Sequence, residues 1–246
     1  MKVLRYLKSN WTGLKNISMA DIVAIIPARG GSKGIPNKNT IDFCGKPLIA
    51  WTIEQCLQSK YIDNVWVSSD SQNILDIAEK YGAKTIKRPD DISGDFATSE
   101  SAWIHSIKII EEDNNIDFVF APQVTSPLRE AKDIDNAIEL FQKENYDSMF
   151  SSCIVEDLFF WKKDKNNKLQ SVNYDYLNRQ RRQDVQGQII ENGSFYILKP
   201  EIIKKYNNRF GGKIGHSKME FWKMFEIDNL EDIRMCRALM QEFLIK

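Results

Sequence analysis

Apolar stretches alternate with amphipathic stretches along residues 21–145, and this alternation most constrains the fold of the 246-residue chain. Runs with little polar interruption, such as DIVAIIP at 21–27, predict strands buried on both faces of a sheet. Stretches with apolar residues at helical spacing predict helices between them. This order predicts an α/β fold with a mainly parallel sheet flanked by helices. The expected strands are 21–27, 62–70, 83–89 and 116–127, and the expected helices are 46–59, 71–82, 98–112 and 130–145.

The pattern changes after about residue 150, where no clean crossover helix can be recognised. Residues 151–190 mix short strand-like pieces, aromatic residues and charges, which predicts a lobe inserted into the sheet. The alternation returns with a strand over 191–200, which is followed by a short helix. A strand over 223–228 and a final helix from Leu230 complete the chain. We therefore expect an N-terminal extension over residues 1–20 and one domain over 21–246 that contains the lobe.

Charge and cysteine content exclude several classes of protein. Basic and acidic residues balance at 34 each, so no overall field favours nucleic acid or a membrane surface as a partner. The four cysteines lie far apart and only two histidines are present, which argues against a zinc site or a disulfide scaffold. No apolar run approaches the roughly 18 residues of a membrane-spanning helix. The basic N-terminus also lacks the pattern of a signal peptide, so we expect a cytoplasmic protein.

A strand that runs directly into a glycine-rich, basic loop is the clearest sign of a ligand site: AIIPARGGSKGIPNKN, from Ala24 to Asn39. Two familiar phosphate loops do not fit it. A P-loop would need Lys and then Ser or Thr after Gly34, and the glycine spacing does not match a dinucleotide fingerprint. In open parallel sheets, ligands bind at the carboxyl ends of the strands. That rule places the loop at one edge with residues 68–70, Arg88 and 123–129.

Eight motifs follow one another along the chain: IIPARGGSKGIPNKN, GKPLIAWTIE, SSD, KRPDDISGDFATS, QVTSPLR, RRQD, ENGSFYI and EIDNLEDI. In this order they resemble the acylneuraminate cytidylyltransferases, also called CMP-sialic acid synthetases, over roughly residues 21–240. The resemblance implies a Rossmann-like nucleotidyltransferase fold that joins CTP to a nonulosonic (sialic-type) acid. It also implies Mg²⁺, with Mn²⁺ as a substitute, and a homodimer whose protruding lobe reaches over the partner's active site.

The resemblance explains the basic loop as a site for the triphosphate of CTP. In the implied reaction the sugar's anomeric hydroxyl attacks the α-phosphorus and pyrophosphate leaves, so fixed positive groups and N–H donors are required. Glycines 30, 31 and 34 let the backbone approach the phosphates closely. Lys38, Arg29 and Asp228 are expected to be catalytic, with Lys38 the most important. The expected nucleotide-binding residues are Arg29, Gly30, Ser32, Lys33, Lys38, Asn39, Arg88 and Ser99.

Three residues are implied for the sugar side. Gln123 follows a buried strand in QVTSPLR, where Ser126–Arg129 are interpreted as mainly architectural. Arg182 lies in the RRQD motif, and an arginine can bind the carboxylate beside the anomeric carbon with paired hydrogen bonds. Tyr196 matches an aromatic residue that lines the family's sugar pocket.

Metal binding is assigned to the acidic pair in FEIDNLEDI. Residues two apart at a strand end point the same way, so Glu226 and Asp228 could both face the site and offer the oxygen ligands that Mg²⁺ requires. The family more often has Asp at the first position. Glu226 is therefore a departure, and Asp228 is the stronger candidate.

Each assignment has a plainer alternative. The basic loop could be solvated, Arg88 could cap a strand end at the surface, the arginine run at 179–182 could form a solvated face, and Tyr196 could belong to the core. At the level of function, the alternatives are a Kdo-type cytidylyltransferase and a nucleotide-binding protein of this fold with impaired catalysis. The motifs do not choose among N-acetylneuraminic acid, its deaminated analogue KDN, legionaminic acid and pseudaminic acid.

Overall fold

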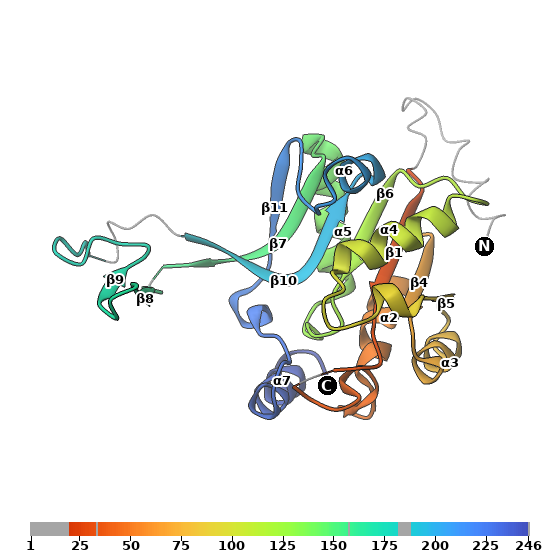
Figure 1. Cartoon of the computed structure of the whole chain (residues 1–246), viewed down its shortest axis with the longest axis horizontal. Coiled ribbons are helices and arrows are strands. Elements are labelled where there is room, and N and C mark those ends of the chain that lie inside the picture. Colours follow the sequence, from red (N-terminus) through yellow and green to blue (C-terminus); the bar gives the residue numbers. More distant parts are fainter. Residues whose placement is uncertain (1–19, 33, 157, 182–187, 246) are drawn as a thin grey trace.

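The computed structural model describes residues 20–32, 34–156, 158–181 and 188–245. Seven strands form one sheet in the order β11-β7-β10-β6-β1-β4-β5, and helices cover both of its faces (Figure 1). The strands of this sheet are β1 (Ile22–Pro27), β4 (Asn64–Ser69), β5 (Lys84–Lys87), β6 (Phe118–Pro122), β7 (Ser148–Val155), β10 (Gln188–Leu198) and β11 (Ile214–Lys218). The helices are α2 (Leu48–Leu57), α3 (Gln72–Lys80), α4 (Ser99–Ile110), α5 (Ala131–Glu144), α6 (Pro200–Tyr206) and α7 (Leu230–Phe243).

The sheet is mainly parallel, as the alternation predicts. Strand β1 pairs in parallel with β4 and β6, and β4 pairs in parallel with β5. Strand β10 is the exception, because it runs antiparallel to both β6 and β7, while β11 pairs in parallel with β7. The carboxyl ends of β1, β4, β5 and β6 therefore meet at one edge of the sheet.

Two apolar clusters lie on opposite faces of the sheet. Helices α2, α3, α5 and α7 pack on the face that includes Ile26, whereas α4 and α6 pack on the face that includes Ile25. Adjacent residues of a strand point to opposite faces, so a strand covered on both sides is apolar at successive positions. This explains the uninterrupted run in β1, all of which is buried except Pro27 at its end.

The predicted helix starts at Ser71 and Thr98 are confirmed by the structure. Ser71 occupies the N-cap position of α3, although its side chain makes no capping hydrogen bond. Thr98 caps α4, and its side-chain oxygen accepts a hydrogen bond from the backbone N–H of Ser101 at 3.2 Å. Among the described residues, no helix is both long and apolar enough to cross a lipid bilayer.

Strands β7 and β10 continue beyond the sheet as a ribbon that leads to β8 (Trp161–Lys163) and β9 (Leu169–Ser171) (Figure 1). We call the connection over residues 156–187 the arm; its described residues are 156, 158–181. A bulge interrupts β10 between Glu191 and Tyr196, and Gly193 within it has a φ of 63°. Bulges bend strands and redirect side chains, so this one marks the place where β10 turns from the sheet toward the arm.

One expectation about the C-terminal third is wrong, and one strand was missed. Residues 225–228 are not a strand; they follow the short 3₁₀ helix η4 (Phe221–Met224) as irregular backbone. Strand β11 was not expected, because its sequence IGHSK has no apolar run or clean alternation. Pairing with β7, a contact between distant parts of the chain, provides its backbone partners. The N-terminal extension lies outside the described residues, apart from Ala20.

Candidate active site

A cleft of about 540 Å³ opens at the edge where the parallel strands end. It brings together residues that are far apart in the sequence, from the loop after β1, the end of β5, the start of α4 and the segment before α7. Those expected from the sequence are Arg29, Ser32, Lys38, Asn39, Arg88, Ser99 and Asp228, and they are joined by Pro27, Gly34, Ser93, Asp95, Ala97, Thr98 and Thr125. Lys33 lies outside the described residues.

Hydrogen bonds between backbone groups of the glycine-rich loop and the side chains of Asp70 and Asn39 hold the loop in place. The N–H of Gly30 donates to Asp70 Oδ1 at 2.9 Å, and the side-chain amide of buried Asn39 donates to the carbonyl of Arg29 at 2.9 Å. The sequence placed Asp70 at this edge but gave it no role. An acidic residue at the end of a predicted parallel strand was the signal that could have identified it as an anchor of the loop.

Lys38 connects the loop to the acidic segment before α7. Its ammonium group donates to the carbonyl of Ile227 at 3.0 Å and to Asp228 Oδ1 at 2.9 Å. The Lys38 side chain is only 14% exposed, whereas that of Asp228 is 70% exposed. Gly34 makes this approach possible, because a Cβ atom there would lie 2.5 Å from the carbonyl oxygen of Asp228. In the described structure, the close neighbour of Gly34 is therefore protein backbone.

Two arginines add positive charge to the cleft in different environments. Arg29 Nη1 donates to the carbonyl of Gly94 at 3.2 Å and lies 3.6 Å from a carboxylate oxygen of Asp95. Arg88 is buried, with its Nη2 atom 3.8 Å from Asp70 Oδ1, and burial lowers the pKa of its guanidinium despite that carboxylate. Among the described residues, Nε and Nη2 of Arg88 have no hydrogen-bond partner. Buried donors of this kind favour a ligand with acceptor atoms.

The start of α4 forms one wall of the cleft, with Ala97 and the N-cap residue Thr98 just before the helix, followed by Ser99. The backbone N–H groups at a helix start have no partners within the helix, and the helix dipole places positive potential there. Ser99 is the first residue of the helix. This wall therefore suits an anion or a group rich in acceptors.

Glu226 lies beside the cleft and does not line it. Its Oε2 atom accepts a hydrogen bond from the Thr125 hydroxyl at 3.1 Å. Burial and the neighbouring charge of Asp228 raise the pKa of Glu226, against the lowering effects of Thr125 and Lys38. Its carboxylate packs on Gly193, where a Cβ atom would lie 1.9 Å from Oε1. The bulge in β10 thus provides the space that the longer acidic side chain needs.

The residues expected to bind the sugar do not line this cleft. Gln123 is half-buried at the end of β6, and its backbone carbonyl accepts a hydrogen bond from Arg129 at 3.1 Å. Tyr196 is buried in the cluster under α4, and its hydroxyl donates to Glu191 Oε1 at 2.6 Å. Arg182 lies outside the described residues. Sugar binding by these three residues stays a prediction.

Arg129 has the architectural role that the sequence suggested. It is 1% exposed, and among its hydrogen bonds Nη1 donates to the carbonyl of Ser194 at 2.6 Å and Nη2 to the hydroxyl of Thr52 at 3.0 Å. Burial lowers the pKa of Arg129 to about 10, against the raising effect of nearby Cys56 and carboxyl groups. These bonds join β10, α2 and the turn after β6 behind the cleft.

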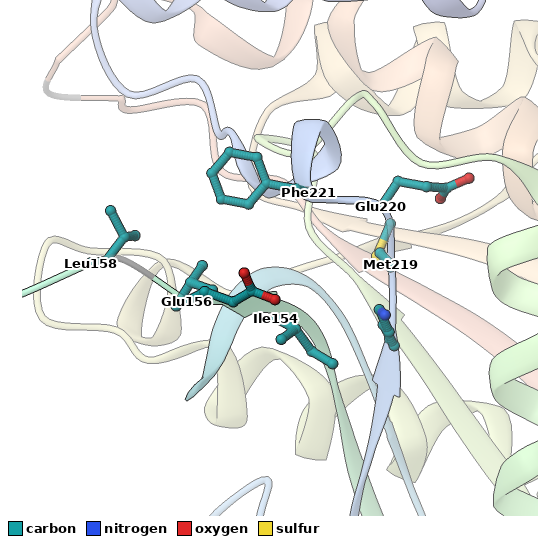
Figure 2. Close-up of a pocket in the computed structure, with 8 residues that line it drawn as sticks. Ile154, Glu156, Leu158, Met219, Glu220 and Phe221 are labelled. Atoms are coloured by element: carbon teal, nitrogen blue, oxygen red, sulfur yellow. The ribbon is translucent and has the colours of Figure 1, made fainter. Parts of the chain in front are cut away.

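A second cavity, of about 630 Å³, lies at the root of the arm. Figure 2 shows side chains around it from the end of β7 and the start of the arm (Ile154, Glu156, Leu158) and from the segment after β11 (Met219, Glu220, Phe221). Most of the surface that lines this cavity is apolar. None of the residues expected to bind nucleotide or metal lines it.

The chain is similar to known proteins over most of its length. A family model described as Cytidylyltransferase matches residues 23–242. N-acylneuraminate cytidylyltransferase A from Danio rerio is 38% identical over 200 residues, which are 80% of this chain and 45% of that protein. Pseudaminic acid cytidylyltransferase from Campylobacter jejuni subsp. jejuni serotype O:23/36 (strain 81-176) is 42% identical over 136 residues, which are 54% of this chain and 59% of that protein. The chain thus spans about half the length of the curated relatives it matches.

A comparison with solved structures supports the fold. A structure of CMP:2-keto-3-deoxy-manno-octonic acid synthetase complexed with CTP aligns with a TM-score of 0.69, covering 92% of this chain and all of the other. Sequence identity in that alignment is 16%, so the likeness concerns the fold.

Proposed function

Because the chain belongs to the cytidylyltransferase family, we propose that it transfers CMP from CTP to the anomeric hydroxyl of a nonulosonic acid, releasing pyrophosphate. The observation that carries this proposal is the cleft in which Arg29, Lys38 and Arg88 converge at the ends of parallel strands. A triphosphate needs such positive groups, and the relatives named for N-acylneuraminate and pseudaminic acid support the class of sugar.

In the proposed reaction the sugar's anomeric oxygen forms a bond to the α-phosphorus of CTP. The bond from that phosphorus to the oxygen bridging it to the β-phosphate breaks, pyrophosphate leaves with that oxygen, and the hydroxyl proton is released to solvent. An ammonium group has three N–H donors; Ile227 and Asp228 accept two from Lys38. We assign the third to a phosphate oxygen, where the fixed charge of Lys38 would stabilise the negative charge that develops in the transition state.

In this proposal, some of the remaining residues of the cleft bind the phosphates of the nucleotide and others bind its base. We assign Arg29 and the hydroxyl of Ser32, which line the cleft, to the phosphates, whereas the N–H of Gly30 is already bonded to Asp70. Arg88 and Ser99 receive the base, because the unpartnered donors of Arg88 suit its acceptor atoms. These assignments follow the family resemblance, and the shared cleft supports them.

The residues present fit a magnesium site that is completed by the substrate. Among the described residues there is no group of three His, Cys, Asp or Glu side chains able to hold an ion. Mg²⁺ bound with nucleotides commonly uses only one or two carboxylates, together with water and phosphate oxygens. Exposed Asp228 would provide the direct ligand and Glu226 would stand behind it. Bound there, the ion would neutralise charge on the triphosphate.

We further propose that the arm joins two copies of the chain into a homodimer. Large apolar side chains are exposed on it, including Leu177 at 81% and Leu169 at 64%. Contiguous exposed apolar surface commonly marks an interface, and the second cavity lies at the arm's root. Sedimentation of wild type and Leu177→Asp tests this: a dimer weakened by Leu177→Asp but not by Leu57→Asp on α2 supports the arm as the interface. A wild-type monomer at micromolar concentration would contradict it.

Formation of CMP-sugar and pyrophosphate from CTP tests the proposed function, using N-acetylneuraminic acid, KDN, legionaminic acid, pseudaminic acid and Kdo as acceptors with Mg²⁺. Turnover with a nine-carbon acid supports the proposal. Turnover with Kdo alone would establish the Kdo-type alternative. Binding of CTP without turnover of any acceptor would favour the nucleotide-binding protein. A cytoplasmic location remains part of the proposal.

A further inference from the structure

Two ion pairs connect α4 to the region of α6, one at each end of α4. At the start, Arg209 Nε donates to Glu100 Oε1 at 2.7 Å, and the two side chains are 20% and 14% exposed. At the far end, Lys204 Nζ donates to Glu111 Oε1 at 2.7 Å, and these side chains are 47% and 32% exposed. The pair at the start is the more buried of the two, and it lies beside the cleft.

Arg209 is fixed by more than its bond to Glu100. Its guanidinium carbon lies 4.4 Å from the centre of the Tyr196 ring and 5.0 Å from that of Trp103. The loop that carries it is anchored to β7, because the Ser148 hydroxyl donates to the carbonyl of Gly211 at 2.9 Å and accepts from its N–H at 3.1 Å. The attraction between a cation and each aromatic ring adds to the ion pair with Glu100 in holding the guanidinium in place. Arg209 is therefore a rigid point on the sheet side of α4.

Glu100 connects Arg209 to the first turn of α4, which forms a wall of the cleft. It immediately follows Ser99, which lines the cleft, and it lies in the first turn of α4. Burial alone would raise the pKa of Glu100, but the hydrogen bond from Arg209 helps to lower it below its ordinary value. The carboxylate therefore carries charge at neutral pH. The first turn of α4 is then held at two places: by the Thr98 cap at its start and by Glu100 against the sheet.

We propose that Arg209 is a positioning residue for nucleotide binding. It acts through Glu100 to hold the first turn of α4 where Thr98 and Ser99 complete the cleft. This inference rests on the proposed function only in naming the nucleotide as CTP. It adds a residue that neither touches the cleft nor belongs to any of the sequence motifs. Since Tyr196 also contacts Arg209, the same cluster links strand β10 to the nucleotide wall.

The test compares Arg209→Met with Lys204→Met, its matched control at the other end of α4. Each variant removes one cation from the contact between α4 and the α6 region, so a general loosening of that contact would affect both alike. We expect Arg209→Met to raise the KM for CTP about tenfold, since small displacements of binding groups have effects of this size. The KM for the sugar should stay within about twofold, as should both constants in Lys204→Met.

Two further measurements separate positioning from simple loss of stability. Amide hydrogen exchange over residues 99–103 should be faster in Arg209→Met and unchanged in Lys204→Met, even if both lower the Tm. Arg209→Lys should recover part of the CTP affinity, and Glu100→Gln combined with Arg209→Met should be no worse than Arg209→Met alone. If Arg209→Met does not fold, Glu100→Gln alone should raise the KM for CTP more than Glu111→Gln.

Equal effects of the two methionine variants on the KM for CTP and on amide exchange would overturn the inference. This failure is distinct from failure of the proposed function, because wild-type turnover decides the latter by itself. If wild type binds CTP without turning it over, the Kd for CTP replaces KM, and the same comparison applies.

Discussion

The nucleotide half and the sugar half of the proposed site differ in how many of their expected residues come together in one cleft of a single chain. On the nucleotide side, the loop after β1 and the ends of neighbouring strands bring Arg29, Lys38 and Arg88 into one cleft. On the sugar side, Gln123 and Tyr196 lie outside that cleft. Most of the nucleotide residues come from one short loop beside parallel strands, whereas the sugar candidates come from three places: Gln123 follows β6, Tyr196 is on β10 and Arg182 belongs to the arm. The proposed homodimer, in which the arm joins two copies of the chain, would account for this difference.

The largest expected effect lies in the nucleotide half. Lys38→Ala should lower kcat by about 10²-fold or more, because the fixed charge at the reacting phosphate is lost. The fold should survive, since only the two hydrogen bonds from Lys38 to Ile227 and Asp228 are removed, and the Tm should stay close to that of wild type. Lys60→Ala, which removes a lysine that is 70% exposed elsewhere, serves as the control. Near-normal turnover in Lys38→Ala would show that this half is not where the chemistry occurs.

The next effect concerns the exposed carboxylate of Asp228 in the nucleotide cleft. Asp228→Asn should lose most of the activity, by roughly tenfold or more, and recover part of it at raised Mg²⁺ or with Mn²⁺. Asparagine can still accept the hydrogen bond from Lys38, so the loss would reflect charge. Activity is titrated against each metal. Wild-type behaviour at every concentration would mean that the triphosphate and other groups hold the ion.

Arg182→Ala tests the sugar half and should act on one substrate only. If this arginine binds the sugar carboxylate, the KM for the sugar should rise about tenfold while that for CTP stays nearly constant. Arg181→Ala, at the neighbouring position, is the control and should change both constants little. If the KM values for the sugar and for CTP rose together in Arg182→Ala, Arg182 would have a structural role and would not distinguish the sugar half from the nucleotide half.

The smallest effects are expected at Glu226. Glu226→Asp restores the commoner family residue and should keep or raise kcat, and Glu226→Gln should be milder than Asp228→Asn. The reason is that Glu226 is bonded to Thr125 and packed on Gly193, beside the cleft. Both variants are assayed in the same metal titration. A loss in Glu226→Gln as large as that in Asp228→Asn would make Glu226 an equal ligand and sharpen the metal site.

The sequence was sufficient where neighbouring residues determine the structure. The parallel strands and the glycine loop follow from apolar runs and a local motif, and their order along the chain determines the edge at which they meet. It was insufficient where distant segments meet. Nothing near Gly34 indicates that the backbone of Asp228 will lie against it, and nothing near Glu226 indicates the space left by Gly193. For the same reason β11, which relies on β7 for its pairing, was missed, and the acidic segment was wrongly taken for a strand end.

The ribbon formed by β7 and β10 has an evolutionary consequence. The arm leaves the sheet from one of these strands and returns to the other, so its length does not alter the register of β6, β1, β4 and β5. Doubling the length of such a connection costs only about 0.6 kcal/mol in chain entropy. Insertions, deletions and exchanges of sequence should therefore accumulate between residues 155 and 188 outside the RRQD motif, while the loop after β1 changes slowly. Homologous chains aligned on this one should diverge first in the rest of the arm.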